Sequence, residues 1–247
     1  MAASLDAPAA LLPYLGELFA DVDSLGSSPR LVAKWLRSAG VGAGSRVLDV
    51  GCGKGAAAVE VARRTGCRVA GVDAFAPFVA AARGLAERRG VADRCVFSVG
   101  TARGARAAGD AFDAAIMLGV APVRDAARIL RRLVRPRGVY MIDDAAWIGV
   151  PGSPQRGGAP TLDEARALLV RAGDRILRER VLRPAEVRRI ERPLRAALSA
   201  RARALGRANP RLRPLLADYL ARQRAAAALL EGPLRPVLWM VRRGGGR

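Results

Sequence analysis

The chain has 247 residues, enough for one large domain or a domain with an appendage, and 51% of them are hydrophobic, which favours a packed globular protein. It has no histidine, and its three cysteines show no paired spacing, so structural zinc, histidine-ligated heme and a Ser-His-Asp triad are excluded or disfavoured and no metal is expected. The formal net charge is +20, and all but two of the 42 basic residues are arginines.

The positive charge is concentrated towards the C-terminus. Residues 161–247 carry 21 basic and 8 acidic side chains, whereas residues 1–160 carry 21 and 14. A basic region of this kind can bind nucleic acid, anionic lipid or an acidic small molecule. The simpler interpretation is a solvated arginine surface produced by codon usage. We favour it because no basic stripe interleaved with aromatic residues and no known nucleic-acid motif occurs.

Two kinds of targeting segment are not found in the sequence. The N-terminus lacks a basic stretch followed by an apolar core, and no segment offers about 18 uninterrupted apolar residues. A reduced, cytoplasmic protein without a membrane partner is therefore expected.

Helices are expected at the N-terminus, and strands and helices alternate after residue 45. Leu11, Leu12, Leu15 and Leu18 recur at helical spacing, and Ser28-Pro29 opens a helix that runs to about residue 38. The expected strands are 46–50, 68–72, 95–99, 112–118 (after a turn at Gly109-Asp110) and 139–143. The expected helices are 56–65, 76–89 and 125–134, the last stopped by Pro136 and Gly138. Each strand is a nearly continuous hydrophobic run, which is typical of a parallel sheet covered by helices on both faces.

The C-terminal part begins with a loop at residues 151–160, judged from its glycine and proline content. A helix at 162–172 and a strand at 175–182 follow. Helices broken near Gly206–Pro214 fill residues 184–231, and a short strand at 236–241 ends the chain. The alternation predicts an α/β class with a doubly wound sheet.

A glycine-rich turn follows the first expected strand. Gly51 and Gly53 allow a ligand to approach the backbone closely, and Asp73 lies where a ribose-binding acid belongs in a dinucleotide fingerprint. The turn alone fits either a nicotinamide dinucleotide or S-adenosylmethionine (SAM). Asp49, at the end of the strand and two residues before Gly51, would repel a pyrophosphate but suits a ligand with an ammonium group, which favours SAM.

Several motifs together resemble the class I SAM-dependent methyltransferases, over about residues 31–243. The sequence Val47-Leu48-Asp49-Val50-Gly51-Cys52-Gly53-Lys54-Gly55 resembles the first motif of that family, and Gly71-Val72-Asp73-Ala74 resembles the acidic end of its second strand. The stretches 110–115 and 133–139 resemble the approaches to the fourth and fifth strands. The resemblance implies a Rossmann-like doubly wound seven-stranded sheet with an antiparallel last strand.

The resemblance also implies one domain over residues 1–247. Its parts are an N-terminal helical lid (1–40), a SAM-binding core (41–160) and a helical insertion or cap before the last strand (184–231).

The resemblance implies a role for each matched position. Gly51 and Gly53 would pass beside the methionine part of SAM, Asp49 would lie near its amino group and Asp73 would bind the ribose hydroxyls. The remaining expected cofactor residues are Ala74, Thr101, Ala102 and Leu118. Thr101 departs from the family, which commonly has an aspartate there. The alternatives are a helix N-cap for Asp73 and a turn acid for Asp49.

Methyl transfer needs alignment more than a general base, so the absence of histidine is tolerable. If a base is used, Asp143 and Asp144 at the end of the fifth strand are the candidates; alternatively, one of them caps the following segment. Tyr14, Trp147 and Tyr219 are candidates for an acceptor pocket, or for core packing.

The resemblance favours a methyltransferase that acts on a small-molecule acceptor, as a monomer or homodimer. The alternatives are an RNA- or protein-directed methyltransferase that uses the basic C-terminal third, a non-catalytic SAM-binding module, and a nicotinamide-dependent oxidoreductase.

Overall fold

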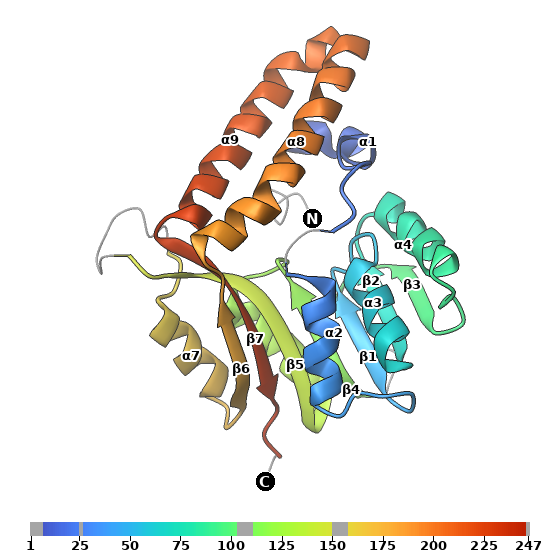
Figure 1. Ribbon diagram of the computed structural model, residues 1–247, viewed down its shortest axis with the longest axis vertical. Helices are drawn as coiled ribbons and strands as arrows, with labels where there is room; N and C mark the ends of the chain where they lie inside the picture. The colour runs from blue at the N-terminus through green and yellow to red at the C-terminus, as the bar shows by residue number, and fades with distance from the viewer. Residues whose placement is uncertain (1–6, 25–26, 103–110, 150–157, 246–247) are drawn as a thin grey trace. The chain divides into compact units, whose positions relative to one another are not determined.

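A computed structural model describes residues 7–24, 27–102, 111–149 and 158–245 (Figure 1). The chain divides into two compact units. The first comprises Met1–Asp23, Ala145–Leu162 and Val181–Pro236, and the second comprises Ser24–Asp144, Asp163–Arg180 and Val237–Arg247. The turn expected at Gly109-Asp110 and most of the loop expected at 151–160 lie outside the described residues.

The described strands form one seven-stranded sheet in the order β3-β2-β1-β4-β5-β7-β6. Strands β1, β2, β3, β4 and β5 pair in parallel. β7 runs against its neighbours: Arg137 N–H donates to Arg243 O (3.1 Å) and Leu182 N–H donates to Pro236 O (2.9 Å). The predicted doubly wound sheet with an antiparallel last strand is confirmed. The strands are β1 (Arg46–Val50), β2 (Arg68–Asp73), β3 (Cys95–Val99), β4 (Phe112–Leu118), β5 (Val134–Trp147), β6 (Arg175–Val181) and β7 (Leu234–Arg242).

The helices follow the predicted ranges closely, and the break in the C-terminal helical region falls where glycine and proline predicted it. They are η1 (Ala9–Tyr14), α1 (Leu15–Leu18), α2 (Pro29–Ser38), α3 (Ala56–Thr65), α4 (Ala76–Arg88), α6 (Val123–Leu133), α7 (Leu162–Val170), α8 (Pro184–Ala208), η3 (Pro210–Leu212) and α9 (Arg213–Glu231). Helices α8 and α9 pack against each other (Figure 1). Among the described helices, none is long and apolar enough to cross a bilayer.

The predicted bounds of the fifth strand, 139–143, were wrong at both ends, since β5 runs from Val134 to Trp147. Pro136 and Gly138 do not separate a helix from a strand, because α6 ends at Leu133 and β5 begins at Val134. The register between β4 and β5 shifts at this point, and Arg137 adopts a left-handed conformation (φ 65°). A bulge of this kind lets a strand carry proline, since the ring's missing N–H is not needed by the ladder.

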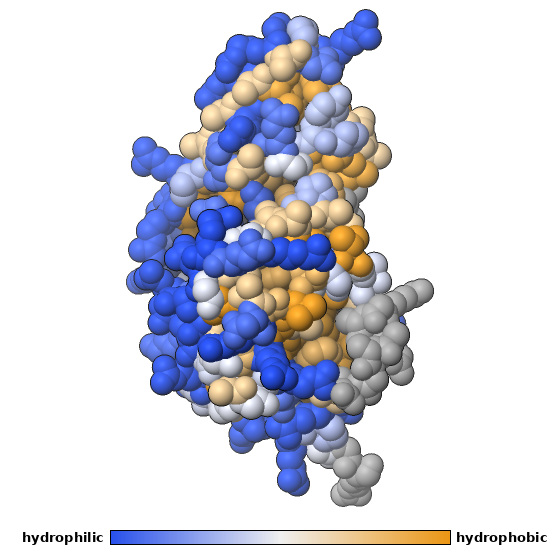
Figure 2. All heavy atoms as spheres, turned by 90° about the vertical axis from the view of Figure 1, so that its right-hand side faces the viewer, coloured by the Kyte–Doolittle hydropathy of each residue, from blue (hydrophilic) through white to orange (hydrophobic). Residues whose placement is uncertain are grey.

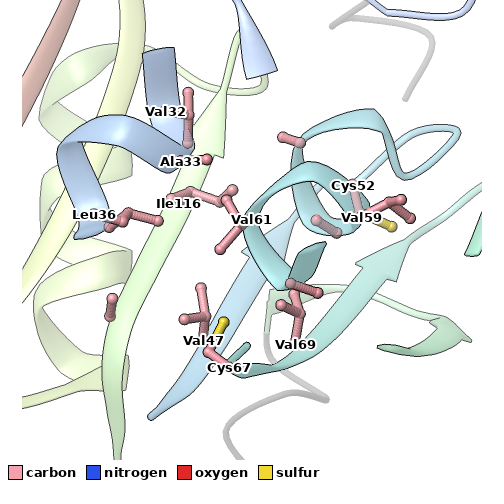
Figure 3. Packing of buried hydrophobic residues seen from close by; sticks show 14 of the residues in the cluster. Val32, Ala33, Leu36, Val47, Cys52, Val59, Val61, Cys67, Val69 and Ile116 are labelled. Carbon is pink, nitrogen blue, oxygen red and sulfur yellow. The ribbon is translucent and has the colours of Figure 1, made fainter. Parts of the chain in front are cut away.

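The core of the second unit lies between the sheet and helices α2 and α3 (Figure 3). Leu36 from α2, Val61 from α3 and Ile116 from β4 are fully buried and point towards one another. Residues 1–40, predicted together as a lid, are therefore divided: α2 belongs to this core, whereas residues up to Asp23 belong to the first unit. The predicted single-domain organisation stays a prediction.

The β3 edge of the sheet has exposed apolar side chains. Val96 is 71% exposed and Val99 is 55% exposed. Figure 2 faces the side that carries α4 and β3 and shows hydrophobic surface among hydrophilic residues there. The Arg83 guanidinium donates to Phe97 O of this strand (2.7 Å from Nη2), which occupies one edge carbonyl that another strand would otherwise use.

The buried carboxylate of Asp174 joins distant segments within the second unit. It accepts hydrogen bonds from Tyr140 Oη (2.8 Å), Arg131 Nε (3.1 Å) and the Gly244 backbone N–H (2.8 Å). These donors come from β5, α6 and the residues after β7. We expect Asp174→Ala to lower the free energy of unfolding by about 3 kcal/mol, because the buried Tyr140 hydroxyl and two half-buried donors lose their acceptor. Denaturant titration measures this change.

Asp163→Ala provides the control, because this carboxylate is 90% exposed although it pairs with Arg166. It should change the free energy of unfolding by less than about 0.5 kcal/mol. Equal effects of the two substitutions would contradict the anchoring role of Asp174.

Candidate functional site

The glycine turn leaves β1 in left-handed conformations. Gly51, Gly53 and Gly55 have φ angles of 72°, 52° and 80°. Gly51 N–H still donates to Val72 O (2.8 Å), so the turn begins as a continuation of the β1–β2 pairing. Residues with a Cβ rarely adopt three such angles so close together.

Only one of these three glycines faces open space. A Cβ on Gly51 would lie 2.3 Å from Val120 Cγ2, and a Cβ on Gly55 would lie 2.8 Å from Ala82 Cβ. No described atom lies within 4 Å of the position that a Cβ on Gly53 would take. Gly51 and Gly55 therefore allow the protein to pack on itself, whereas Gly53 is where a ligand can reach the backbone.

Asp49 places a carboxylate at the end of β1, where it is 2% exposed. Its Oδ2 has no hydrogen-bond partner among the described residues. The pKa of Asp49 is raised to about 7, first by burial and second by the negative charge of Asp73, while a hydrogen bond from the Ala58 backbone N–H opposes the shift. The site thus has one acceptor oxygen that a cationic donor could satisfy.

Asp73 ends β2, and the surrounding backbone fixes its carboxylate. Oδ2 accepts a hydrogen bond from Gly53 N–H, and Oδ1 accepts one from Phe75 N–H, both at 2.9 Å. The side chain is half-buried, so each oxygen keeps a lone pair for a ligand. The alternative role of Asp73 as a helix N-cap does not match the geometry. The N-cap of α4 is Phe75, and it makes no side-chain capping bond.

The residues expected at the adenine end lie near the ends of β2 and β3. Ala74 and Thr101 are exposed, and Ala102 is half-buried. Gly100 N–H donates to Asp73 O (2.9 Å), which ties the segment after β3 to the end of β2. Four expected cofactor residues therefore lie at the carboxyl ends of the neighbouring strands β2 and β3: Asp73, Ala74, Thr101 and Ala102.

The two candidate bases, Asp143 and Asp144, were predicted at the end of the fifth strand but lie inside β5, which continues to Trp147. Both carboxylates accept backbone hydrogen bonds. Asp143 is 6% exposed, and its Oδ2 accepts Ser27 N–H (2.6 Å). Burial raises the pKa of Asp143 to about 6, while hydrogen bonds from the Ser27 side chain and backbone oppose the shift. Asp144 Oδ2 accepts Val123 N–H (2.7 Å) at the first turn of α6.

The loop between β4 and α6 is held by β5 at both ends. Leu118 ends β4 opposite Asp143 and is half-buried. Gly119 N–H donates to Asp143 O (2.9 Å), and Val123 N–H to Asp144 Oδ2. This places Val120 against Gly51.

Sequence reasoning did not identify Ser27, which is separated from Asp143 by 116 residues. No sequence pattern indicates that contact.

The three aromatic acceptor candidates lie in the first unit. Trp147 is 3% exposed and Tyr219 is 0% exposed, whereas Tyr14 is half-buried. Within that unit Trp147 N–H donates to Pro160 O (2.8 Å). The burial of Trp147 and Tyr219 is what a packing role requires; their role towards an acceptor stays a prediction.

The raised pKa of Asp49 predicts how stability depends on pH. An aspartate of ordinary pKa, about 3.9, ionises in the unfolded chain well below pH 7, so the buried carboxylate costs stability progressively from about pH 4 to pH 7. Asn avoids this cost. We expect Asp49→Asn to stabilise the free protein, with a gain at pH 8 that exceeds the gain at pH 5 by about 2 kcal/mol. Denaturant unfolding at the two pH values measures the difference, and an equal effect at both would contradict the burial of an ionisable carboxylate.

Comparisons with known proteins agree with this arrangement. Residues 47–138 match a family model described as a methyltransferase domain. Methyltransferase GfsG from Streptomyces halstedii is 37% identical over 108 residues, which cover 42% of this chain and 39% of that protein. Ribosomal protein L11 methyltransferase from Vibrio parahaemolyticus is 32% identical over 108 residues, covering 44% of this chain and 36% of that protein. The chain thus matches about two fifths of the length of these curated relatives.

A solved SAM-dependent methyltransferase from Geobacter sulfurreducens, in complex with S-adenosyl-L-homocysteine, superposes with a TM-score of 0.76. It is 23% identical, and the match covers 91% of this chain and 95% of that chain. At this identity the likeness concerns the fold. Residues 47–138 thus match a methyltransferase domain, and the chain has the fold seen in solved SAM-dependent methyltransferases.

Proposed function

We propose that this chain binds SAM at the edge of the sheet where β1 and β2 end and transfers its methyl group to a small molecule. The observation that carries the proposal is the buried Asp49 carboxylate, whose unpaired Oδ2 lies at the start of the turn in which Gly53 faces open space. A buried acceptor without a donor is costly unless a ligand supplies one.

The charge of the site favours SAM over a nicotinamide dinucleotide. Asp49 and Asp73 are close enough for the charge of one to raise the pKa of the other. A pyrophosphate placed over this turn would add like charge to both carboxylates. The amino group and sulfonium of SAM would instead neutralise them, and no phosphate would need to be accommodated.

The hydrogen bonds of Asp73 suit recognition of a ribose. The backbone N–H groups of Gly53 and Phe75 hold its two oxygens in place, so the carboxylate need not be ordered when the ligand binds. Each oxygen can then accept one of two neighbouring hydroxyls. At the adenine end, Thr101 provides a hydroxyl in place of a carboxylate, which supports weaker side-chain recognition of the base.

SAM, when bound, supplies a methyl group on a sulfonium, which is already an excellent leaving group. The protein's task is to align the acceptor and exclude competing water. The clamped loop after β4 is suited to alignment, because Asp143 and Asp144 fix it at both ends. These contacts favour a positioning role for the two aspartates, and a general base remains unnecessary for an amine, a thiolate or an acidic carbon or oxygen.

Two similarities bear on the choice of acceptor. The resemblance to small-molecule methyltransferases favours a metabolite as the acceptor. The match to the ribosomal protein L11 methyltransferase supports a protein acceptor as the second candidate. We retain Tyr14, Trp147 and Tyr219 as proposed acceptor-pocket residues and cytoplasmic methylation as the proposed setting.

Equilibrium binding of S-adenosyl-L-homocysteine and of NAD by calorimetry tests the cofactor. We expect micromolar binding of S-adenosyl-L-homocysteine and no comparable binding of NAD. Asp73→Ala should weaken S-adenosyl-L-homocysteine binding at least about a hundredfold, because two ribose hydrogen bonds to a charged acceptor are lost. Tight NAD binding without S-adenosyl-L-homocysteine binding would refute the proposal.

Gly53→Ala tests the position of the ligand. The substitution should weaken S-adenosyl-L-homocysteine binding at least about tenfold, because its methyl group projects into the space that the ligand would take. Gly90→Ala is the matched control, since Gly90 also has a positive φ (66°) and open space around it but lies beyond α4. Both variants carry a similar backbone strain, so an equal effect on affinity would show that strain, and not contact with the ligand, is responsible.

A further inference from the structure

Helix α8 carries seven arginines, and they divide into two sets. Arg188 and Arg195 lie 3.9 and 3.4 Å from the Glu231 carboxylate, and Arg201 lies 2.6 Å from Asp21. These three hold α8 to α9 and to the N-terminal segment of the same unit. The other four are exposed and have no hydrogen-bond or ion-pair partner in the part of the chain that the structure describes: Arg189, Arg192, Arg203 and Arg207.

These four side chains, the arginine stripe, share one face of the helix. At about 100° per residue they fall within a sector about 80° wide, and they extend over about 27 Å. The helix is continuous from Pro184 to Ala208, although Pro193 lies inside it. Ala196 and Ala200 are exposed in the same sector, and no acidic residue of α8 falls there.

We propose that the arginine stripe docks an acidic α-helix of a partner protein. The arginines form two pairs, Arg189–Arg192 and Arg203–Arg207, about three turns apart. Glutamates or aspartates three and four residues apart, in two groups on one face of such a helix, would meet these pairs. The planar guanidinium pairs with a carboxylate through two hydrogen bonds, which gives both attraction and orientation. Ala196 and Ala200 are small enough for a second helix to approach within about 8–10 Å.

Two other polyanions fit the stripe less well. RNA recognition commonly uses aromatic side chains for base stacking, but Tyr219 is the only aromatic residue of α8 and α9, and it is fully buried. A helix that lies on a membrane needs a large apolar face beside its basic residues, whereas this sector has only alanines between its arginines. The proposal does not depend on the cofactor site, because it rests on α8 alone.

The test uses the full chain and two synthetic peptides of identical composition. Both are alanine-based helices; one carries its glutamates on a single face, and the other distributes them around the helix. Titration by fluorescence anisotropy at physiological ionic strength should show that the one-face peptide binds at least about tenfold more tightly. The quadruple variant with Arg→Gln at positions 189, 192, 203 and 207 should lose this preference.

A second quadruple variant controls for net charge. It carries Arg→Gln at Arg88, Arg89, Arg124 and Arg132, which are exposed on or beside α4 and α6. It should keep the preference for the one-face peptide, and thermal unfolding should confirm that both variants remain folded. Equal losses in the two variants would mean that only total charge matters and would overturn the proposal.

Bulk tRNA and phosphatidylglycerol vesicles distinguish the other partners. If the stripe variant loses binding to either of them, and neither peptide is preferred by the unmodified chain, the stripe is a nucleic-acid or lipid surface and the proposal is wrong. If the stripe variant still binds tRNA and vesicles as the unmodified chain does but loses the preference for the one-face peptide, the proposal is supported.

Discussion

The candidate site is organised around a carboxylate that is buried before any ligand arrives. Asp49 sits at the end of a central strand, where water cannot reach its Oδ2, and the backbone above it turns through left-handed conformations. Folding energy from the surrounding core compensates for this unfavourable group, as is common where a site is preorganised for a charged ligand. The adjacent Asp73 increases the negative potential, so the pair forms a small electronegative centre within a chain whose overall charge is strongly positive.

Strand β5 is linked to the glycine turn beside Asp49 through hydrogen bonds to the loop that follows β4. Its residues Asp143 and Asp144 accept hydrogen bonds from Ser27 before α2 and from the two ends of the loop that follows β4. The loop in turn presses Val120 onto Gly51. A change at Asp143 or Asp144 would therefore reach the glycine turn through the loop after β4, whose Val120 packs against Gly51.

Local patterns in the sequence were sufficient for most of the fold. The strands at 46–50, 95–99 and 112–118 and the helices at 29–38 and 56–65 have the predicted bounds, because each is a continuous apolar run or an amphipathic segment bounded by glycine or proline. The start of β5 was missed because the strand contains Pro136 at a shift of register with β4, and its end was missed because the strand continues past the two aspartates to Trp147. Asp49 and Asp73 could be found from the turn motif. The Ser27–Asp143 contact and the two-unit division could not, since both depend on segments far apart in the chain.

The place of β7 in the sheet has a consequence for synthesis of the protein. This last strand lies between β5 and β6, so β6 has no described sheet neighbour other than β7. As the chain leaves the ribosome, the parallel strands β1 to β5 can pair, whereas β6 must wait until residues 234–242 have emerged. Helices α8 and α9, which lie between β6 and β7 in the sequence, are synthesised before β7 emerges. Co-translational folding should therefore begin with the half of the sheet that carries the glycine turn and end with insertion of β7.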